Sequence, residues 1–495
     1  MSLRDRIKVS IVIAISVAGV WLISSQLLIH NSIRLDEAQS LWQTSHSLRG
    51  TLKVIAQDVH VPLYHILLHH WQIIFGQSIE TARMLSLLFF ILSIPVVYLL
   101  ARRILSVNWS LLVVLLFSFS PFMNWYANEA RMYTLLVFVT LLNQLYFTKI
   151  VQTKGRKGWL GYLLSASVGI YSHYFFMFSL LSQAIYVLLT RKRYVKRTLL
   201  KFTAVAATLA ALFIPWFLYF RSLGSASNTS PNLQTPSSID FFNVYSQFMF
   251  GFQTDVLNTI FVSLWPILVL VALLSVNKGQ RFEPKVIYML TAAILPVVLA
   301  FIISATVTPF FVSRYMIACL APLLILLVWL VSHYKRPLYT SIVILLVLVT
   351  GLTSWRQYTS AETPVKEDFK TAAADIGRDA RASDIVVLSA PFSVYPFNYY
   401  YDGDAKVTTL PLWDRTVPGP LPAFDKGKLD AQAKQLNDNH QYVYLLLSSD
   451  QGYQEDIFQY YEQRFENTAS YRYSPDLELQ VYRVGYNQDP AIGEL

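Results

Sequence analysis

The stretch VSIVIAISVAGVWLISSQLLI, residues 9–29, decides the class of this chain. It contains no charged side chain, and as a helix it is long enough to cross a hydrocarbon core about 30 Å thick. Arg4, Arg6 and Lys8 precede it, but the run is too long for a signal-peptide core and no small-residue cleavage site follows. We therefore expect a retained membrane-spanning helix.

The rest of the chain repeats this pattern. Hydrophobic residues make up 54% of the sequence and charged residues 14%, whereas about a quarter of a soluble domain is charged. The single cysteine, Cys319, lies inside an apolar run, so no disulfide can form within the chain. We predict eleven spans, at residues 9–29, 82–101, 108–126, 131–149, 159–172, 174–190, 202–220, 257–276, 286–305, 314–332 and 338–355.

The basic residues orient these spans. Of the 27 Lys and Arg residues in residues 1–355, 20 lie in one alternating set of loops, which the positive-inside rule places in the cytoplasm. This basic charge therefore indicates membrane orientation and not nucleic-acid binding. The basic loops on either side of the apolar stretch 159–190 both belong to the cytoplasmic set. The stretch must therefore cross the membrane twice, and we expect it to turn near Ser172 and His173. Seven of the nine acidic residues then fall outside, which makes the external face the expected working face.

The last 140 residues differ from the membrane part in charge and in sequence pattern. Residues 1–355 carry a net charge of +18 and residues 356–495 a net charge of −8. In the second part, DIVVLSA and QYVYLLLSS resemble buried strands, LELQVYRV alternates as a strand does, and two segments between them have helical patterns. We expect a transmembrane domain over 1–355 and an extracytoplasmic α/β domain over 356–495. The tyrosines of NYYYDGD, residues 398–404, either pack that domain or stack on sugar rings.

Three stretches that are expected to be external contain candidate functional side chains. HNSIRLDEAQSLWQ carries Asp36 and Glu37 directly after the first span; the alternative is that these acids only cap a short helix. QDVHVPLYHILLHHWQIIFG has apolar residues on one helical face and His and Gln on the other, a pattern typical of an interfacial helix. SPFMNWYANEARMY places Glu129, Arg131 and aromatic residues at one turn, which indicates a site for an anionic, partly hydrophobic substrate.

These motifs, in this order, resemble those of the polytopic lipid-phosphate-dependent glycosyltransferases of the C superfamily, such as protein O-mannosyltransferases and aminoarabinose transferases. The resemblance covers roughly residues 9–332 and is strongest in the first 150. One departure is DVHVPLY, where relatives usually have a second proline after the histidine. The resemblance implies an α-helical polytopic membrane protein with external interfacial helices in the first loop and an extracytoplasmic C-terminal domain. It also implies an enzyme that transfers a hexose or pentose from a polyprenyl-phosphate sugar.

Carried onto this sequence, the family pattern makes Asp36 the catalytic base, with Glu37 beside it. Arg131 and Arg314 would hold the lipid phosphate, because arginine binds phosphate in bidentate geometry and charges at membrane depth are usually functional. For Arg314 the alternative is an arginine that snorkels from a helix end. Glu129 would hold the acceptor, hold a metal or pair with Arg131. The remaining candidates for substrate binding are His60, Tyr64, Tyr133, His173 and Tyr315.

Cofactors and partners are less specific. We expect no obligatory cofactor, with a divalent metal as an open alternative because His65 and His69 are one helical turn apart. The expected partners are a polyprenyl-phosphate-linked sugar, an acceptor glycan, lipid or protein, and membrane lipids, but no nucleic acid. The expected location is a bacterial inner membrane, with the N-terminus cytoplasmic. The alternatives are a transporter or flippase of lipid-linked sugars, or a non-enzymatic assembly protein.

Overall fold

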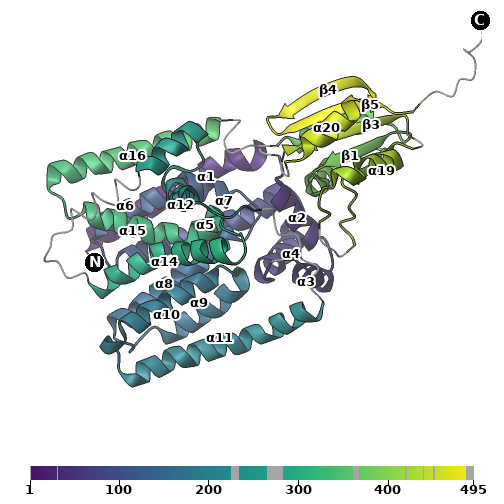
Figure 1. Ribbon diagram of the computed structural model, residues 1–495. Helices are drawn as coiled ribbons and strands as arrows, with labels where there is room; N and C mark the ends of the chain where they lie inside the picture. The colour runs from purple at the N-terminus through teal and green to yellow at the C-terminus, as the bar shows by residue number, and fades with distance from the viewer. Residues whose placement is uncertain are drawn as a thin grey trace, which may run out of the picture. The chain divides into compact units, whose positions relative to one another are not determined.

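The computed structural model describes residues 2–30, 32–58, 60–223, 233–264, 283–360, 367–417, 421–438, 440–449 and 452–485. These residues divide into two units that interleave along the chain. The first contains Met1–Ile29 and most of the chain between Thr44 and Pro364, and the second contains His30–Gln43 together with Val365–Leu495. Figure 1 labels the helices and strands of both units.

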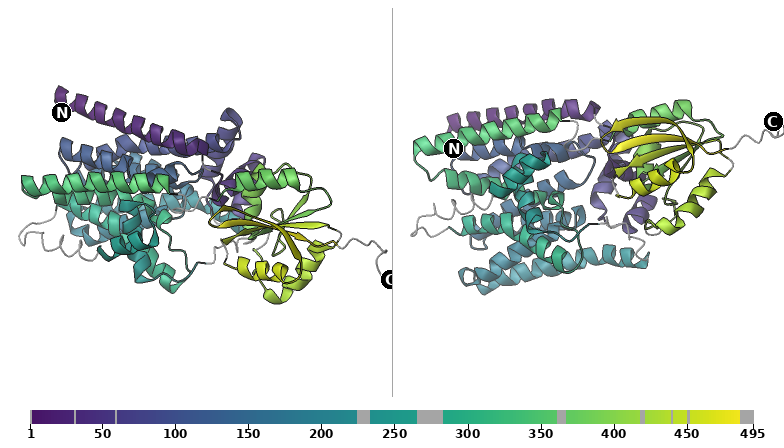
Figure 2. Two further views of the ribbon diagram at one scale, coloured as in Figure 1. Left: turned by 90° about the horizontal axis from the view of Figure 1, so that it is seen from above. Right: turned by 45° about the horizontal axis from the view of Figure 1, so that its top comes forward.

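The first unit is entirely helical in the part that is described. Its long helices run alongside one another in both views (Figures 1 and 2). The helices are α1 (Leu3–His30), α3 (Leu48–Ala56), α4 (Leu63–Phe75), α5 (Ile79–Ala101), α6 (Val107–Ser118), α7 (Pro121–Ala127), α8 (Tyr133–Gln152), α9 (Trp159–Ser172), α10 (Phe176–Leu189), η1 (Arg191–Arg193), α11 (Lys196–Ser222), α12 (Ser238–Phe250), α14 (Pro284–Thr306), η2 (Ser313–Cys319), α15 (Leu320–Val331) and α16 (Arg336–Thr359).

Seven described helices are long and apolar enough to cross a membrane, or eight if the bent pair α6 and α7 counts as one span. The predicted turn near Ser172 is present, because α9 ends there and α10 begins at Phe176. The predicted span 257–276 lies partly outside the described residues, and only an apolar helix over Asp255–Leu264 is seen. The polytopic helical class is therefore confirmed, whereas the number of eleven spans is not.

The predicted span 108–126 is not one straight helix. It breaks after α6, and α7 continues at an angle of 55°. Ser120 accepts a hydrogen bond from the Met123 backbone N–H and caps α7, while Pro121 has no N–H to continue the ladder of α6. The side-chain amide of Asn124 donates to the carbonyls of Ser118 and Ser120 at 2.8 and 2.9 Å. Internal partners of this kind let a helix break at membrane depth.

Large apolar side chains remain exposed along the outer helices of the first unit. Ile15 of α1, Leu218 of α11 and Leu348 of α16 are 56%, 59% and 56% exposed. In water, such rows of apolar surface would mark an interaction site. On helices of this length and hydropathy they are the surface that lipid covers.

The second unit is an α/β domain that also contains α2 (Leu35–Thr44). Its five-stranded sheet has the order β2-β1-β3-β5-β4, in which β1 is parallel to β2 and β3, and β5 is antiparallel to β3 and β4. The predicted α/β class of the tail is confirmed. Its elements are α17 (Phe369–Asp379), β1 (Ile385–Ser389), η3 (Pro391–Ser393), α18 (Val394–Tyr400), β2 (Lys406–Thr409), α19 (Lys426–Asn437), β3 (Tyr442–Ser448), α20 (Gln454–Glu462), β4 (Glu466–Ser474) and β5 (Leu477–Arg483).

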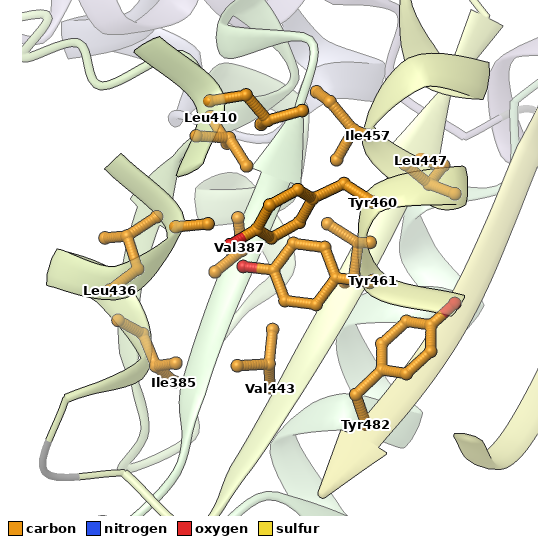
Figure 3. Packing of buried hydrophobic residues seen from close by; sticks show 13 residues of the cluster. Ile385, Val387, Leu410, Leu436, Val443, Leu447, Ile457, Tyr460, Tyr461 and Tyr482 are labelled. Atoms are coloured by element: carbon orange, nitrogen blue, oxygen red, sulfur yellow. The ribbon is translucent and has the colours of Figure 1, made fainter. Parts of the chain in front are cut away.

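Helices cover both faces of this sheet (Figure 2). Alternate residues of β1, Ile385 and Val387, enter a core with residues of α19 and α20, including Leu436 and Tyr461 (Figure 3). The residues between them in β1 are also fully buried. A strand that is buried on both faces reads as a continuous apolar run, which explains why DIVVLSA was recognisable in the sequence.

Candidate active site

The turn between α7 and α8 carries Glu129 and Arg131. Both side chains are buried, at 1% and 4% exposure, although the turn connects two helix ends. The backbone N–H of Arg131 donates to the Glu129 carbonyl at 2.7 Å. The Asn128 amide fastens the turn by donating to Ser24 Oγ at 3.1 Å and to the Asn124 carbonyl at 2.8 Å. The turn is therefore part of the packed interior of the first unit.

Arg131 contacts His60, which lies in the short connection before α4. Arg131 Nη2 is 3.1 Å from His60 Nε2. A guanidinium can only donate, so Nε2 accepts and the imidazole is neutral with its proton on Nδ1. The Asp58 carboxylate lies 3.8 Å from the same nitrogen, beyond hydrogen-bond distance but close enough to add negative charge. The pairing of the predicted residues His60 and Arg131 comes from segments 71 positions apart.

Tyr64 supports this arrangement from α4. Its hydroxyl is 3.0 Å from Ser86 Oγ of α5, and Ser86 Oγ donates to the Arg131 carbonyl at 3.0 Å. Because the single proton of Ser86 is used for that carbonyl, the Tyr64 hydroxyl donates to Ser86. Tyr64 is fully buried, so it holds the main chain of Arg131 through Ser86.

His173 lies in the turn between α9 and α10, close to other residues that were predicted to bind the substrate. Its ring centroid is 6.2 Å from that of Tyr133 and 5.7 Å from that of Tyr315. The guanidinium of Arg314 lies 5.5 Å from the Tyr315 ring centroid. His173 Nδ1 accepts a hydrogen bond from the Phe175 backbone N–H at 3.1 Å. The neutral ring consequently carries its proton on Nε2.

The electrostatics of His173 show that groups from several segments act on it. Desolvation is the main cause that lowers the pKa of His173 from 6.5 to about 3, and electrostatic interactions with His60, Arg131 and Arg314 lower it further. Three groups from different segments therefore act on one imidazole. A buried region of this kind favours a bound anion and disfavours further positive charge.

His65 is a further functional candidate. The sequence indicated it only as a possible metal ligand and did not show that it is buried. Its side chain is fully buried, and its ring stacks on His60 with centroids 5.6 Å apart. Desolvation, followed by electrostatic interactions with His60 and Arg131, holds the pKa of His65 well below 6.5, against smaller raising effects of Asp58 and the Val61 backbone. On α4, His65 and Gln72 are thus buried, whereas His70, Ile73 and Ile74 are exposed.

The sequence did not identify Asp58 or Ser86 as residues of the site. Asp58 lies inside a stretch that the sequence had marked, but Ser86 is an ordinary serine in an apolar run and gave no signal. Arg83 did give a signal in the sequence, since a charged residue within a membrane span is costly. It is buried, and its guanidinium donates to the Leu28 carbonyl at 3.3 Å. Across the described residues, no three His, Cys, Asp or Glu side chains form a group that could hold a metal ion.

Asp36 and Glu37 lie in the second unit, at the start of α2. Glu37 is fully buried, and its Oε2 accepts a hydrogen bond from the Arg34 backbone N–H at 2.9 Å. This is the capping geometry of a helix N-terminus. Asp36 is partly exposed. The two adjacent acids therefore differ: Glu37 fixes the beginning of the helix, and Asp36 retains access to solvent.

Comparison with known proteins shows which family and which solved structures the chain resembles. The family model described as dolichyl-phosphate-mannose-protein mannosyltransferase matches residues 59–219, a segment that contains His60, Arg131 and His173. No curated protein sequence matches the chain significantly.

Among solved structures, ArnT from Cupriavidus metallidurans in the apo state matches with a TM-score of 0.60 and 13% identity, covering 95% of this chain and 97% of that chain. ArnT bound to undecaprenyl phosphate has a TM-score of 0.58 and 12% identity, with 97% and 99% covered. The archaeal oligosaccharyltransferase AglB from Archaeoglobus fulgidus, in complex with an inhibitory peptide and a dolichol-phosphate, has a TM-score of 0.50 and 12% identity, with 99% and 75% covered. The resemblance to the C superfamily of glycosyltransferases, and its fold, are confirmed.

Proposed function

We propose that this chain is a membrane glycosyltransferase that moves a sugar from a polyprenyl monophosphate to an acceptor hydroxyl at the external membrane face. The observation that carries the proposal is that two guanidiniums, those of Arg131 and Arg314, act on the buried His173, while His60 bonds to Arg131. Such a place suits an anion that arrives from the lipid phase. ArnT and AglB were each solved with a polyprenyl-type phosphate, undecaprenyl phosphate and dolichol-phosphate respectively.

In this proposal Arg131 and Arg314 bind the phosphate of the donor. When the bond between the anomeric carbon and the phosphate oxygen breaks, the leaving phosphate gains negative charge, and fixed guanidinium donors stabilise that charge. The neutral His173 donates through Nε2 without competing as a cation. Tyr133 and Tyr315 border His173 and offer aromatic surface to the sugar or to the first isoprene units.

Asp36 is proposed as the base. It takes the proton of the acceptor hydroxyl while that oxygen attacks the anomeric carbon from the side opposite the phosphate. The products are the glycosylated acceptor, with inverted anomeric configuration, and the polyprenyl phosphate. The partial exposure of Asp36 supports this role over Glu37, which is buried and bonded to the helix start. Glu129 remains a candidate for holding the acceptor.

The test is Asp36→Asn, which keeps the size of the side chain and removes its basicity. We expect the purified variant to transfer sugar at least about 10²-fold more slowly, the usual effect of losing a positioned base, while its binding of undecaprenyl phosphate stays unchanged. The donors are a panel of hexosyl and pentosyl undecaprenyl phosphates, offered together with cell-envelope extract as the source of acceptor. Glu37→Gln should have a milder effect.

Glu80→Gln is the matched control, because Glu80 is an exposed acid at the start of α5 on the same predicted side. It should retain the wild-type rate. A well-folded Asp36→Asn protein that transfers sugar at the wild-type rate would remove Asp36 from the mechanism and direct attention to Glu129.

A further inference from the structure

The helix that carries Asp36 belongs to the same compact unit as the C-terminal domain. This helix, α2, has only ten residues, and an isolated helix of that length is marginal in water. Its stability and direction must therefore come from what it packs against. Within the second unit, the contacts that are described lie at both of its ends.

The first contact lies just before the helix begins. The backbone N–H of Ile33 donates to the hydroxyl of Tyr400, at the end of α18, with a distance of 2.9 Å. Ile33 itself is buried at 1% exposure. Since Ile33 is three positions before Asp36, this bond fixes the chain immediately ahead of the proposed base. Tyr400 belongs to the NYYYDGD stretch, and this bond assigns it a structural role.

The second contact lies near the end of the helix. The ring of Trp42 is 5.3 Å from that of Tyr395. The guanidinium of Arg415 lies 5.7 Å from the Trp42 ring centroid and 5.5 Å from the Tyr395 ring centroid. Tyr395 is buried and also packs against Trp413, with centroids 6.0 Å apart. Arg415 therefore interacts with an aromatic pair whose two members come from α2 and from the C-terminal domain.

Two contacts at opposite ends constrain a helix in a way that one cannot. Leu35 and Trp42 are separated by about 10 Å along a helix that rises 1.5 Å per residue. A hydrogen bond before one end and a tilted aromatic contact near the other restrain both sliding and rotation. Asp36 lies between the two contacts, so the backbone that carries its carboxylate is held in place.

We propose that Tyr400 and Arg415 are positioning residues for Asp36, so that the C-terminal domain is a required part of the transfer reaction. This inference rests on the proposed role of Asp36 as the base. It assigns the domain a function that does not require the domain to bind either substrate.

The structure offers closely matched controls for both residues. Arg464 lies 4.2 Å from the ring centroid of its neighbour Tyr460, the same kind of cation–π contact in the same unit but between residues of the domain itself. Tyr401 donates its hydroxyl to the Ala405 carbonyl at 3.0 Å, again within the domain. Arg464→Ala and Tyr401→Phe therefore remove comparable contacts that do not involve α2.

The experiment compares Tyr400→Phe and Arg415→Ala with these two controls. We expect kcat to fall at least tenfold with the KM for the donor unchanged, because only the alignment of the base is lost. Hydrogen–deuterium exchange of the peptide over residues 30–43 should become faster in the same two variants. Both control variants should retain wild-type kcat and wild-type exchange. Arg415→Lys keeps a cation over the rings and should recover part of kcat; it carries the test if Arg415→Ala does not fold.

The result separates this inference from the proposed function. Adding Arg415→Ala to Asp36→Asn should cause no further loss of kcat, since the base through which Arg415 acts is already absent. Full activity of Asp36→Asn would overturn the proposed function itself. A large loss in Asp36→Asn combined with normal kcat and normal exchange in Tyr400→Phe and Arg415→Ala would overturn only the positioning role. Equal losses in Arg464→Ala and Tyr401→Phe would also overturn it, by showing a general effect of the domain's stability.

Discussion

The buried imidazole of His173 should make the protein less stable as the pH falls below about 6.5, its ordinary pKa. In the folded state His173 Nδ1 accepts a hydrogen bond from the Phe175 N–H, and protonation of that nitrogen would abolish the bond. Desolvation, together with electrostatic interactions with His60, Arg131 and Arg314, lowers the pKa of His173 to about 3. The unfolded chain keeps the ordinary value.

Between pH 3 and 6.5 the unfolded state therefore binds one more proton than the folded state. The free energy of unfolding rises with pH in this window, by about 1.4 kcal/mol per pH unit, and does not depend on this group above it. From pH 7.5 to pH 5 the loss due to His173 amounts to about 2 kcal/mol. Its neighbour His65, whose pKa is also lowered, acts in the same direction, so the contribution of His173 must be measured as a difference.

His173→Asn isolates this contribution, because an asparagine Oδ1 can accept the same backbone hydrogen bond and does not titrate. We expect the variant to lose about 2 kcal/mol less stability than the wild type between pH 7.5 and pH 5. The measurement is unfolding in detergent micelles titrated with SDS, at a series of pH values. His70→Asn, at an exposed position, is the control and should follow the wild type. Equal pH dependence of wild type and His173→Asn would refute a buried, neutral His173.

Three further outcomes follow from the site and its supports. Arg314→Lys keeps the charge but loses the bidentate geometry, so undecaprenyl phosphate should bind about tenfold or more weakly, a loss of about 1.4 kcal/mol, whereas Arg221→Lys at an exposed helix end should bind normally; unchanged binding by Arg314→Ala would remove Arg314 from the phosphate site. Ser86→Ala removes a buried hydroxyl that bonds to Tyr64 and to the Arg131 carbonyl, which should lower the free energy of unfolding by about 1–3 kcal/mol; no change would mean that these two hydrogen bonds do not stabilise the fold. Gly169→Ala places a methyl group against the ring of Phe176 and should destabilise the protein by about 1–3 kcal/mol, which SDS titration would measure, and a neutral result would show that the ring can move aside.

The sequence alone revealed the order of the candidate site motifs, because each motif is local. Asp36 and Glu37 after the first span, Glu129 and Arg131 at a turn, and the histidines of α4 all stand out as polar groups beside apolar runs. The same reading could not decide which of two adjacent acids is the accessible one. That depends on which carboxylate reaches the Arg34 N–H, a matter of helix geometry that places Glu37 at the cap.

The contacts between residues of the site could not be predicted from the sequence. Nothing local links Ser86 to Tyr64 and Arg131, and nothing local indicates that His60 accepts from Arg131. These contacts join segments that meet only after the helices pack.

What the sequence determined by itself is the class of the protein: a polytopic helical membrane part, interfacial helices in its first loop, and an α/β tail. Length, hydropathy and strand alternation suffice for this, because each is a property of a short window of the chain. The tertiary structure alone decided that α2 forms one unit with the C-terminal domain, through a bond that joins Ile33 to Tyr400 across 367 positions. No window contains both residues, and their contact depends on the packing of every element between them, so only the folded chain could reveal it.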